Sequence, residues 1–287
     1  MTLANGQLSF NGYVLGDDIR TFMLELTGWD DLPPVTSGNT QRSMYHGSYA
    51  GSKYARERII TWTGVLNLPD TYSWAEEIAA LRKATGLTDT EYPITVRTID
   101  EELVCYGSVT ARAIPNNRLF GAAGIASVSI QFTASDPRKY STTSTMLSIG
   151  MPEVSSSGLV YPLEYPLDYG TASSTGAGSF NNVGDAPLPC IWTITGPLDN
   201  PVVYNDTTGR FIELAITLAA GESVTIDTSD GSVILNGTTD RLYTKTVASS
   251  PISLMELVPG NNALRASAAS WSSGAGASVT AKDGAYF

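Results

Sequence analysis

The sequence predicts a mainly β protein of two domains, with a single helix in its first half. Three observations support this: Gly, Ser and Thr are abundant among the 287 residues, apolar and polar residues alternate in several short runs, and turn dipeptides separate those runs. The length suits two domains of common size, each with its own core. We therefore place a β-rich domain at residues 1–150, a connecting segment at 151–179 and an antiparallel β-sandwich at 180–287.

Five runs in the first half have the composition of strands. In two of them, the second and the last, every second residue is apolar or small, so one face of each strand is expected to meet a core. The five runs are Phe22–Leu26, Arg58–Leu66, Ile94–Thr98, Leu103–Ala113 and Ala126–Ala134.

Between these runs, a helix is predicted from Ser73 to Gly86. Ser73 is a good N-cap, Glu76 three residues later completes a capping box, and Gly86 supplies the stop. Apolar side chains recur at helical spacing and predict the face that meets the core: Trp74, Ile78 and Leu81. The polar side chains expected to point elsewhere are Glu77, Arg82 and Lys83.

Residues Asp30–Tyr54 form a polar segment that is too long for an ordinary turn. The segment contains Pro33-Pro34 and then many Ser, Gly, Asn, Gln and Tyr residues. Such segments in compact domains are usually functional or disordered. Two interpretations stay open: an arm that becomes ordered only against a neighbouring subunit, or a loose surface loop. The candidate interface residues of such an arm are Asp30, Arg42, Tyr45, His46, Tyr49 and Tyr54.

The segment Gly158–Gly170 contains Tyr-Pro-Leu followed by an acidic residue, twice in succession. Pro162 and Pro166 fix φ, lack an N–H group and favour extended conformations in the preceding tyrosines. Neither a helix nor a central strand is therefore expected. We interpret the segment as a semi-rigid strap between two domains, with Thr171–Ser179 as a hinge. The alternative is a Pro-rich linker whose repeat has no function.

The second half consists of short strand-like runs at close intervals, separated by turn residues. Asn236-Gly237 is a strong signal for a two-residue hairpin. About seven strands without helical periodicity predict an antiparallel β-sandwich. The runs are Leu188–Thr195, Val202–Tyr204, Arg210–Leu218, Ser223–Asp227, Ser232–Asn236, Ala263–Ala268 and Ser278–Ala281.

Charge and hydropathy exclude some partners. The formal net charge of −11 divides into −3 for residues 1–150 and −8 for residues 151–287, and an acidic half argues against phosphate contacts with nucleic acid. No window approaches the ~20 apolar residues needed to cross a bilayer. The first residues contain no basic segment followed by an apolar one, so we expect no secretory signal. We expect no membrane insertion and a protein kept in a cytoplasm until it is assembled. Cys105 and Cys190, in apolar runs, are expected to be buried free thiols.

Residues that could carry catalysis are few. The only histidine, His46, has no nucleophile motif nearby, and no Cys/His cluster has metal-ligand spacing. Adjacent acidic residues on a strand point to opposite faces, so the doublets are expected at turns and on the surface. The acidic doublets are Asp17-Asp18, Asp30-Asp31 and Glu101-Glu102. We therefore expect no enzyme activity, no metal and no cofactor.

Aromatic residues of the second half leave a binding role open, because their rings could pack against sugar faces. Trp192, within Cys190–Thr195, is expected to pack inside the sandwich by strand alternation. Trp271, in a Ser- and Gly-rich setting, and Tyr243 remain candidate glycan contacts.

A series of motifs runs along nearly the whole chain. Ile130–Tyr140 closes the first domain, the Tyr-Pro-Leu repeat follows, and turn motifs then come in a fixed order: Asn182–Pro187, Ile194–Pro197, Thr208-Gly209, Gly221-Glu222, Ile226–Thr228, Leu235–Gly237 and Leu257–Asn262. In order and spacing, this series resembles the distal tail proteins of siphophages, the long-tailed bacteriophages with non-contractile tails.

The resemblance implies a fold and a role. Distal tail proteins form a hexameric ring at the tail tip, with an N-terminal belt domain around the channel and a galectin-like or carbohydrate-module-like sandwich outside. The ring joins the tail tube to the tail-associated hub and receptor-binding proteins, with the tape measure protein as a further partner. By this resemblance, Asp30–Tyr54 is a belt arm, Ser73–Gly86 the belt helix and Asp136–Tyr140 the end of the belt domain.

Two alternatives to this virion adaptor are retained. The first is a carbohydrate-binding tail or baseplate accessory protein that holds host cell-wall glycan through its sandwich. The second is a cell-wall hydrolase, against which the lack of catalytic motifs argues.

Overall fold

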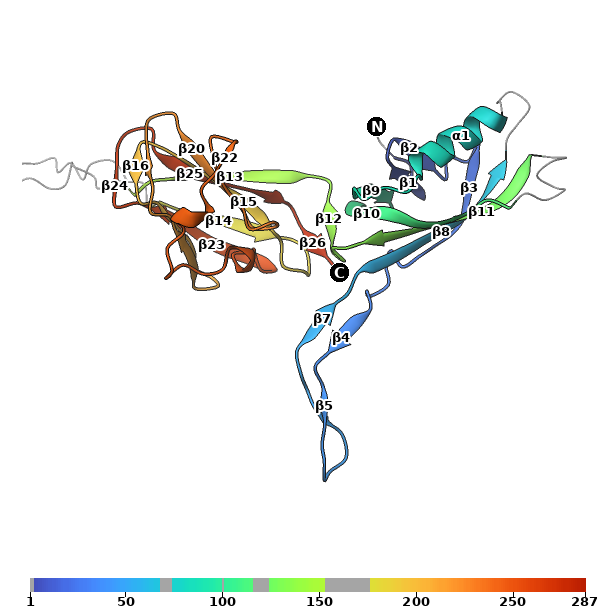
Figure 1. Ribbon diagram of the computed structural model, residues 1–287, viewed down its shortest axis with the longest axis horizontal. Coiled ribbons are helices and arrows are strands. Elements are labelled where there is room, and N and C mark those ends of the chain that lie inside the picture. Colours follow the sequence, from blue (N-terminus) through green and yellow to red (C-terminus); the bar gives the residue numbers. More distant parts are fainter. Residues whose placement is uncertain (1–2, 68–73, 100, 116–123, 153–175) are drawn as a thin grey trace, which may run out of the picture. The chain divides into compact units, whose positions relative to one another are not determined.

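The computed structural model describes residues 3–67, 74–99, 101–115, 124–152 and 176–287, which form two compact units (Figure 1). Unit 1 comprises residues 1–142 and 286–287, and unit 2 comprises residues 143–285. The described residues are mainly antiparallel β-strands with one α-helix, so the predicted fold class is confirmed.

Unit 1 is built on a nine-stranded sheet in which the order β2-β1-β9-β10-β11-β8-β3 forms the main path. The five predicted strands are present, each with ends within two residues of the prediction. The strands are β1 (Gln7–Phe10), β2 (Tyr13–Leu15), β3 (Thr21–Thr27), β8 (Arg58–Asn67), β9 (Tyr92–Arg97), β10 (Glu102–Ala113) and β11 (Ile125–Ala134), with β12 (Lys139–Ser141) and β26 (Ala285–Tyr286) off this path.

The core of unit 1 follows from the alternation in β8 and β11. Their register pairs Trp62 with Ile130 and Ile60 with Phe132, so all four side chains lie on one face and are fully buried. Gly64 continues the same row of β8. A Cβ atom there would lie 2.3 Å from the Trp62 ring, so the glycine makes room for the indole.

The helix α1 (Trp74–Ala84) packs on this sheet through Leu81, which is fully buried, while Trp74 and Ile78 are half-buried. The predicted N-cap Ser73 lies outside the described residues. At the other end, Arg112 Nη1 donates to the carbonyl oxygens of Arg82 and Thr85, both at 3.0 Å. A cation at this position satisfies terminal carbonyls and complements the helix dipole. In the part of the chain described, no helix is long and apolar enough to span a membrane.

Unit 2 contains a six-stranded sheet (β13-β25-β15-β20-β21-β22), a four-stranded sheet (β14-β23-β17-β18) and a three-stranded sheet (β19-β16-β24), all antiparallel. The strands are β13 (Ser144–Gly150), β14 (Ala177–Asn182), β15 (Cys190–Thr195), β16 (Leu198–Asp199), β17 (Val202–Asn205), β18 (Arg210–Glu213), β19 (Thr217–Leu218), β20 (Ser223–Asp227), β21 (Val233–Leu235), β22 (Thr239–Asp240), β23 (Gly260–Ser267), β24 (Ser270–Trp271) and β25 (Gly276–Lys282). Two short 3-10 helices, η1 (Leu242–Thr244) and η2 (Ile252–Leu254), lie between β22 and β23.

Alternate residues of the two larger sheets form the core of unit 2. Trp192 of β15 is fully buried, as the strand alternation predicts. Asn236 and Gly237 both have positive φ, as expected for this dipeptide, but three residues separate the paired Leu235 and Thr239, one more than predicted.

The two cysteines are free thiols and buried, as expected. Burial raises the pKa of Cys105 and of Cys190 to about 12 in each case. Both thiols are therefore protonated and unreactive at neutral pH.

The boundary between the units differs from the predicted one at residue 150. It falls between Thr142 and Thr143, because β13 pairs along its length with β25 of unit 2. The Tyr-Pro-Leu repeat lies outside the described residues, but the strands on either side of it, β13 and β14, both belong to unit 2. The repeat therefore connects two strands of one unit, not two domains. The predicted hinge Thr171–Ser179 also overlaps the start of β14 at Ala177.

Candidate functional site

The arm, residues Asp30–Tyr54, is a narrow two-stranded ribbon that continues from the ends of β3 and β8 (Figure 1). Near its root, β4 (Val35–Ser37) pairs with β7 (Lys53–Ala55). Farther out, β5 (Thr40–Gln41) pairs with β6 (Ser48–Tyr49). The arm thus has regular strand pairing, which the sequence analysis did not predict.

The two strands of the ribbon come closest at Gly38 and Gly51. The Gly38 N–H donates to the Ser52 carbonyl at 3.0 Å, and a Cβ atom added to Gly51 would lie 2.2 Å from the Gly38 carbonyl oxygen. Glycine permits such a close approach of two backbones because it has no side chain. The path of the arm therefore depends on Gly51.

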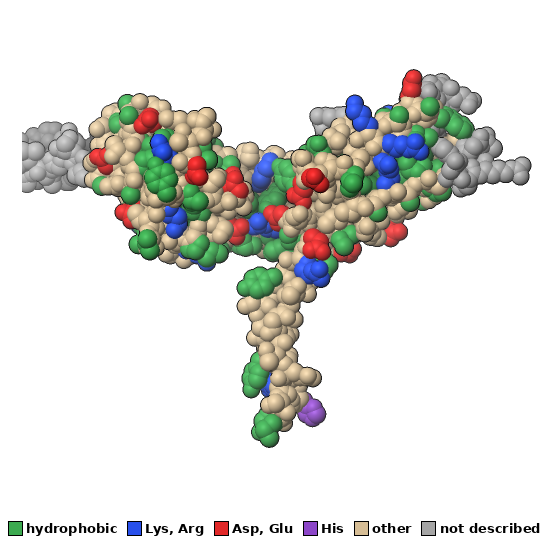
Figure 2. Space-filling view, in the orientation of Figure 1, with side chains coloured by type: hydrophobic (Ala, Val, Ile, Leu, Met, Phe, Trp, Pro, Cys, Tyr) green, Lys and Arg blue, Asp and Glu red, His purple; other side chains and the backbone are tan. Residues whose placement is uncertain are grey.

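The arm carries large apolar side chains that are mostly exposed. Met44 is 86% exposed, Tyr45 81%, Tyr49 63% and Tyr54 70%. Figure 2 shows apolar side chains along the arm and His46, the only histidine, at its far end. Isolated two-stranded ribbons are marginally stable in water, and exposed clusters of large apolar residues mark interaction surfaces. These features are typical of a segment that packs against a partner.

Beyond Asp30 and Asp31 at its root, the arm carries basic charges only. Residues 32–55 contain no Asp or Glu, whereas Arg42 and Lys53 are basic, in a chain of net charge −11. The Arg42 guanidinium lies over the Tyr49 ring, 4.9 Å from its centroid, so the structure brings these two candidate residues together. Asp30 lies apart from them, at the root of the arm, where its Oδ1 accepts a hydrogen bond from Lys139 Nζ at 3.1 Å.

The root of the arm contains a buried arginine that the sequence analysis did not single out. Arg58, 1% exposed, donates through Nη1 to the carbonyl oxygens of Gly28 (2.7 Å), Trp29 (2.9 Å) and Asp31 (2.8 Å), and through Nε to that of Pro137 (2.7 Å). Burial lowers the pKa of the Arg58 guanidinium from its ordinary value. One signal in the sequence was available: Arg58 is a charged residue at an inward-facing position of an alternating strand.

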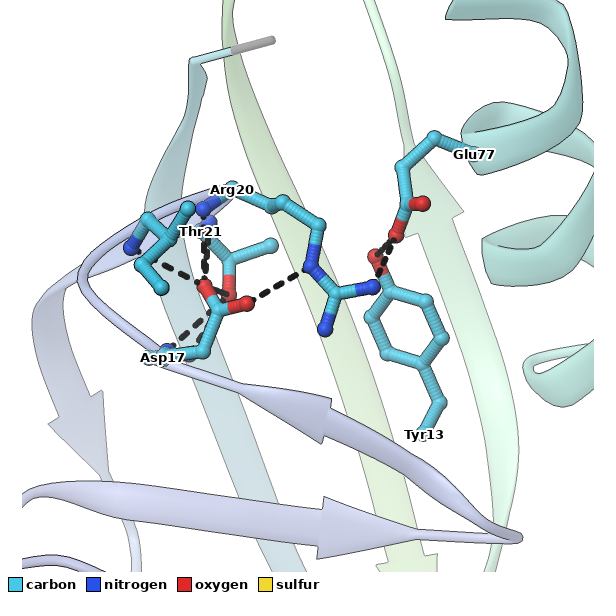
Figure 3. Close-up of polar contacts among 7 residues, drawn as sticks. Tyr13, Asp17, Arg20, Thr21 and Glu77 are labelled. Carbon is cyan, nitrogen blue, oxygen red and sulfur yellow. Dashed lines mark hydrogen bonds and ion pairs between the residues drawn. The ribbon is translucent and has the colours of Figure 1, made fainter. Parts of the chain in front are cut away.

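A polar cluster joins α1 to the turn between β2 and β3 (Figure 3). Glu77 Oε1 accepts hydrogen bonds from Tyr13 Oη at 2.9 Å and from Arg20 Nη1 at 3.0 Å. Arg20 Nε also donates to Asp17 Oδ2 at 2.7 Å, and Asp17 Oδ1 accepts from the Thr21 N–H at 2.8 Å. The Glu77 side chain is only 12% exposed, so the prediction that it points away from the sheet is wrong.

The protonation of this cluster follows from its surroundings. Burial, then the hydrogen bond to Glu77, raises the pKa of Tyr13 above its ordinary value, so the phenol stays a neutral donor. Burial alone would raise the pKa of Asp17, but hydrogen bonds from Thr21 and Arg20 outweigh it and hold that pKa below 3.8. The cluster is therefore a charged link between α1 and the sheet.

Of the candidate glycan contacts, Trp271 lies on β24 and Tyr243 in η1, both in unit 2. Trp271 is 36% exposed and borders two shallow hollows of about 330 and 200 Å³. Asp199 and Ser270 line the smaller hollow, with Ser270 Oγ donating to Asp199 Oδ2 at 2.7 Å. Tyr243, 76% exposed, lines neither hollow and accepts a hydrogen bond from Arg241 at 2.9 Å. Trp271 therefore adjoins both of these hollows.

Comparisons with known proteins give one family and several structures. Residues 183–275 match the family described as "Siphovirus-type tail component, C-terminal domain". No curated protein sequence matches the chain. The structure is similar to that of the Dit protein (gp 19.1) of phage SPP1, described as a paradigm of the hub adsorption apparatus in phages that infect Gram-positive bacteria. That match has a TM-score of 0.68 and 14% identity and covers 98% of this chain and 99% of the SPP1 protein.

Two further similar structures come from the baseplate of phage P2 in its activated conformation. The chain in the structure with Ca has a TM-score of 0.53 and 11% identity, covering 96% of this chain and 97% of that chain. The chain in the structure with Sr has a TM-score of 0.51 and 11% identity, covering 96% of both chains. The expected resemblance to siphophage distal tail proteins is thereby confirmed, by the tail-component match in unit 2 and by the shared fold.

Proposed function

Since the chain has the fold of a siphophage distal tail protein, we propose that it is a structural protein of a siphophage virion, located at the tail tip. Six copies form a ring, the distal tail adaptor, between the tail tube and the hub with its receptor-binding apparatus. The observation that carries this proposal is a structural match that extends over both units, not over the tail-component segment alone.

The arm supports a ring made of identical subunits. A closed ring of head-to-tail contacts needs two different complementary surfaces on each copy. The arm supplies one of them: an exposed ribbon with apolar side chains, basic residues and no acidic ones in residues 32–55. An acidic surface on the next copy of this chain, whose net charge is −11, is a suitable receiver.

The proposed partners are other copies of this chain, the tail tube protein and the tail-associated hub protein. The tape measure protein and the receptor-binding proteins are further proposed neighbours. In this proposal the protein is assembled in the host cytoplasm, acts without a cofactor and is not an enzyme.

The oligomeric state tests the proposal. Size-exclusion chromatography with light scattering should give a particle of about 182 kDa, which is six times the chain mass of 30.4 kDa. Negative-stain images should show six-fold rings with a central hole. A monomer at all concentrations, also in the presence of the tube and hub proteins, would contradict the proposal.

A shortened arm tests which part closes the ring. Replacing residues 38–52 by Asn-Gly closes the ribbon at the Ser37–Lys53 pair through a favoured two-residue turn. We expect both units to keep their circular dichroism while the ring is lost. Replacing the exposed Ser127 of β11 by Ala is a control that should leave the ring intact. Hexamers of the shortened protein would remove the arm from the interface.

A second candidate function rests on Trp271. A half-exposed indole beside hollows lined by polar groups, including Asp199 and Ser270, is suited to a sugar ring. The proposal is that unit 2 holds host cell-wall glycan at this place, either in addition to the ring role or instead of it.

Binding to purified cell walls tests this second candidate. Trp271→Ala should reduce the bound fraction, whereas Tyr106→Ala, which removes a 41% exposed aromatic residue from unit 1, should not. Tyr243→Ala then decides whether that tyrosine contributes. Equal binding by Trp271→Ala and the parent protein would exclude glycan contact at Trp271.

A further inference from the structure

The root of the arm contains two buried cations, although isolated charges are rarely buried. Arg58 and Lys139 are 1% and 5% exposed. Lys139 Nζ lies 5.5 Å from the centroid of the Trp29 ring and 3.1 Å from Asp30 Oδ1. Both cations thus contact the same turn, residues 28–31, through which β3 leads into the arm.

Arg58 joins three segments of unit 1 that are distant in sequence. It stands at the start of β8, where the returning strand of the arm enters the sheet. Its Nη1 donates to three carbonyls of the 28–31 turn at 2.7–2.9 Å, and its Nε donates to Pro137 after β11. One side chain therefore ties together both strands of the arm, where they leave and re-enter the sheet, and a third segment of the unit.

The geometry of arginine suits this task and that of lysine does not. The guanidinium is planar and has five N–H donors in a rigid fork, whereas the ammonium group of lysine is a compact point charge. Every acceptor of Arg58 is a backbone carbonyl, so these contacts fix the main chain itself.

Stability alone does not account for a buried arginine here. Desolvating a cation is costly, and a well-packed apolar residue of similar volume often gives equal or greater stability. The Arg58 Nη2 atom is buried without a hydrogen-bond partner among the described residues, which adds to that cost. What an apolar side chain cannot do is hold the three carbonyls of the turn in a fixed direction.

We infer that Arg58 is the positioning residue of the arm: it sets the direction in which the arm leaves the sheet. The importance of that direction rests on the proposed function, since an arm that reaches a neighbouring copy must point at it. Lys139 supports Arg58 by holding Asp30 and Trp29 of the same turn.

Spin labels on the full-length protein test this inference. One label is attached at Ser48→Cys on β6 of the arm and the other at Ser127→Cys on β11, both exposed positions in unit 1. The native cysteines are buried, so labelling is selective for the introduced ones. Spin-diluted samples limit the signal to distances within one chain. The variant is Arg58→Met, and the control is Arg56→Met, which removes a largely exposed arginine two residues away.

The parent protein and Arg56→Met should both give one narrow distance distribution. Arg58→Met should give a broadened and shifted distribution while the circular dichroism of the protein stays unchanged. Should Arg58→Met not fold, Arg58→Lys keeps the charge but cannot reach all four carbonyls, and the same broadening is expected. A narrow, unshifted distribution in the folded variant overturns the inference.

Ring formation is measured separately and tests the proposed function. A broadened distance distribution with unchanged hexamers would leave Arg58 as the positioning residue and contradict the role of the arm in ring closure. A narrow distribution with lost hexamers would contradict the inference and leave the proposed function standing.

Discussion

Replacing Glu77 by Ala tests whether the polar cluster of Figure 3 attaches α1 to unit 1. The substitution removes the acceptor for Tyr13 Oη and Arg20 Nη1 and leaves both donors partly buried. Arg20 keeps its contact with Asp17. Glu76, the neighbouring residue on the same helix, is exposed, so Glu76→Ala is a matched control.

The expected cost follows from the two hydrogen bonds. Both bonds have the Glu77 carboxylate as acceptor, and a hydrogen bond to a charged group contributes about 1.5–3 kcal/mol. The Arg20 side chain is 32% exposed, which weakens its ion pair with Glu77 through solvent screening. We therefore expect Glu77→Ala to destabilise the docked helix by about 2 kcal/mol. Glu76→Ala should change the stability of the docked helix by less than about 0.5 kcal/mol.

Hydrogen exchange of the α1 amides is the suitable assay, because a chain of two units has no single unfolding transition. A loss of about 2 kcal/mol corresponds to roughly 30-fold faster exchange through helix opening. Glu76→Ala should exchange like the parent protein. Equal exchange rates in Glu77→Ala and Glu76→Ala would refute the role of the cluster in holding the helix.

Three further predictions concern pH, thiol chemistry and the arm. Because the pKa of Asp17 is depressed on folding, its contribution to stability is present above the ordinary value of 3.8 and is lost as the pH falls through its lower folded value. The free energy of unfolding of unit 1, measured by amide exchange, should thus differ between the parent protein and Asp17→Asn at pH 7, and the two values should converge in acid; a constant difference would contradict this. Cys105 and Cys190 should react with a thiol reagent at pH 8 only after unfolding, and reaction in the native protein would show that they are accessible. Gly51→Ala should speed amide exchange at Gly38, whose N–H bonds to Ser52, and reduce ring yield. Ser48→Ala, at an exposed position of the same ribbon, is the control.

Strand alternation predicted core residues of both units, because a strand that is buried on one face has an apolar residue at every second position. Ile60, Trp62, Ile130 and Phe132 of unit 1 are buried as their spacing indicates, and so is Trp192 of unit 2. These positions depend on local periodicity, which a single sequence contains.

The arm and its root could not be predicted in the same way. Its strands are two or three residues long and exposed on both faces, so no alternation marks them. Arg58 is positioned by carbonyl groups of residues 28–31 and 137, which only the folded chain brings near it. Similarly, Glu77 lies on the polar side of its helix in sequence, but the distant Tyr13 and Arg20 enclose it.

Two further features of the structure differ from the sequence prediction: the hairpin of β1 and β2, and the boundary between the two units. The hairpin of β1 and β2 has a signal in the sequence, Asn11-Gly12, with positive φ at both residues between the paired Phe10 and Tyr13. The domain boundary was placed too late because β13 pairs with β25, more than a hundred residues later in the chain. No local pattern indicates a partner at that separation.

A photo-crosslinker at Tyr45, near the end of the arm and 81% exposed, tests the central claim that the arm of one copy contacts the next copy. Chains labelled with 14N and with 15N are mixed before ring assembly and then irradiated, and the crosslinked peptides are analysed by mass spectrometry. If the arm reaches the next copy, peptide pairs joined at residue 45 should combine both isotopes, which identifies them as contacts between copies. Pairs of a single isotope only, recovered from intact rings, would place the arm on its own subunit and exclude the proposed contact between copies.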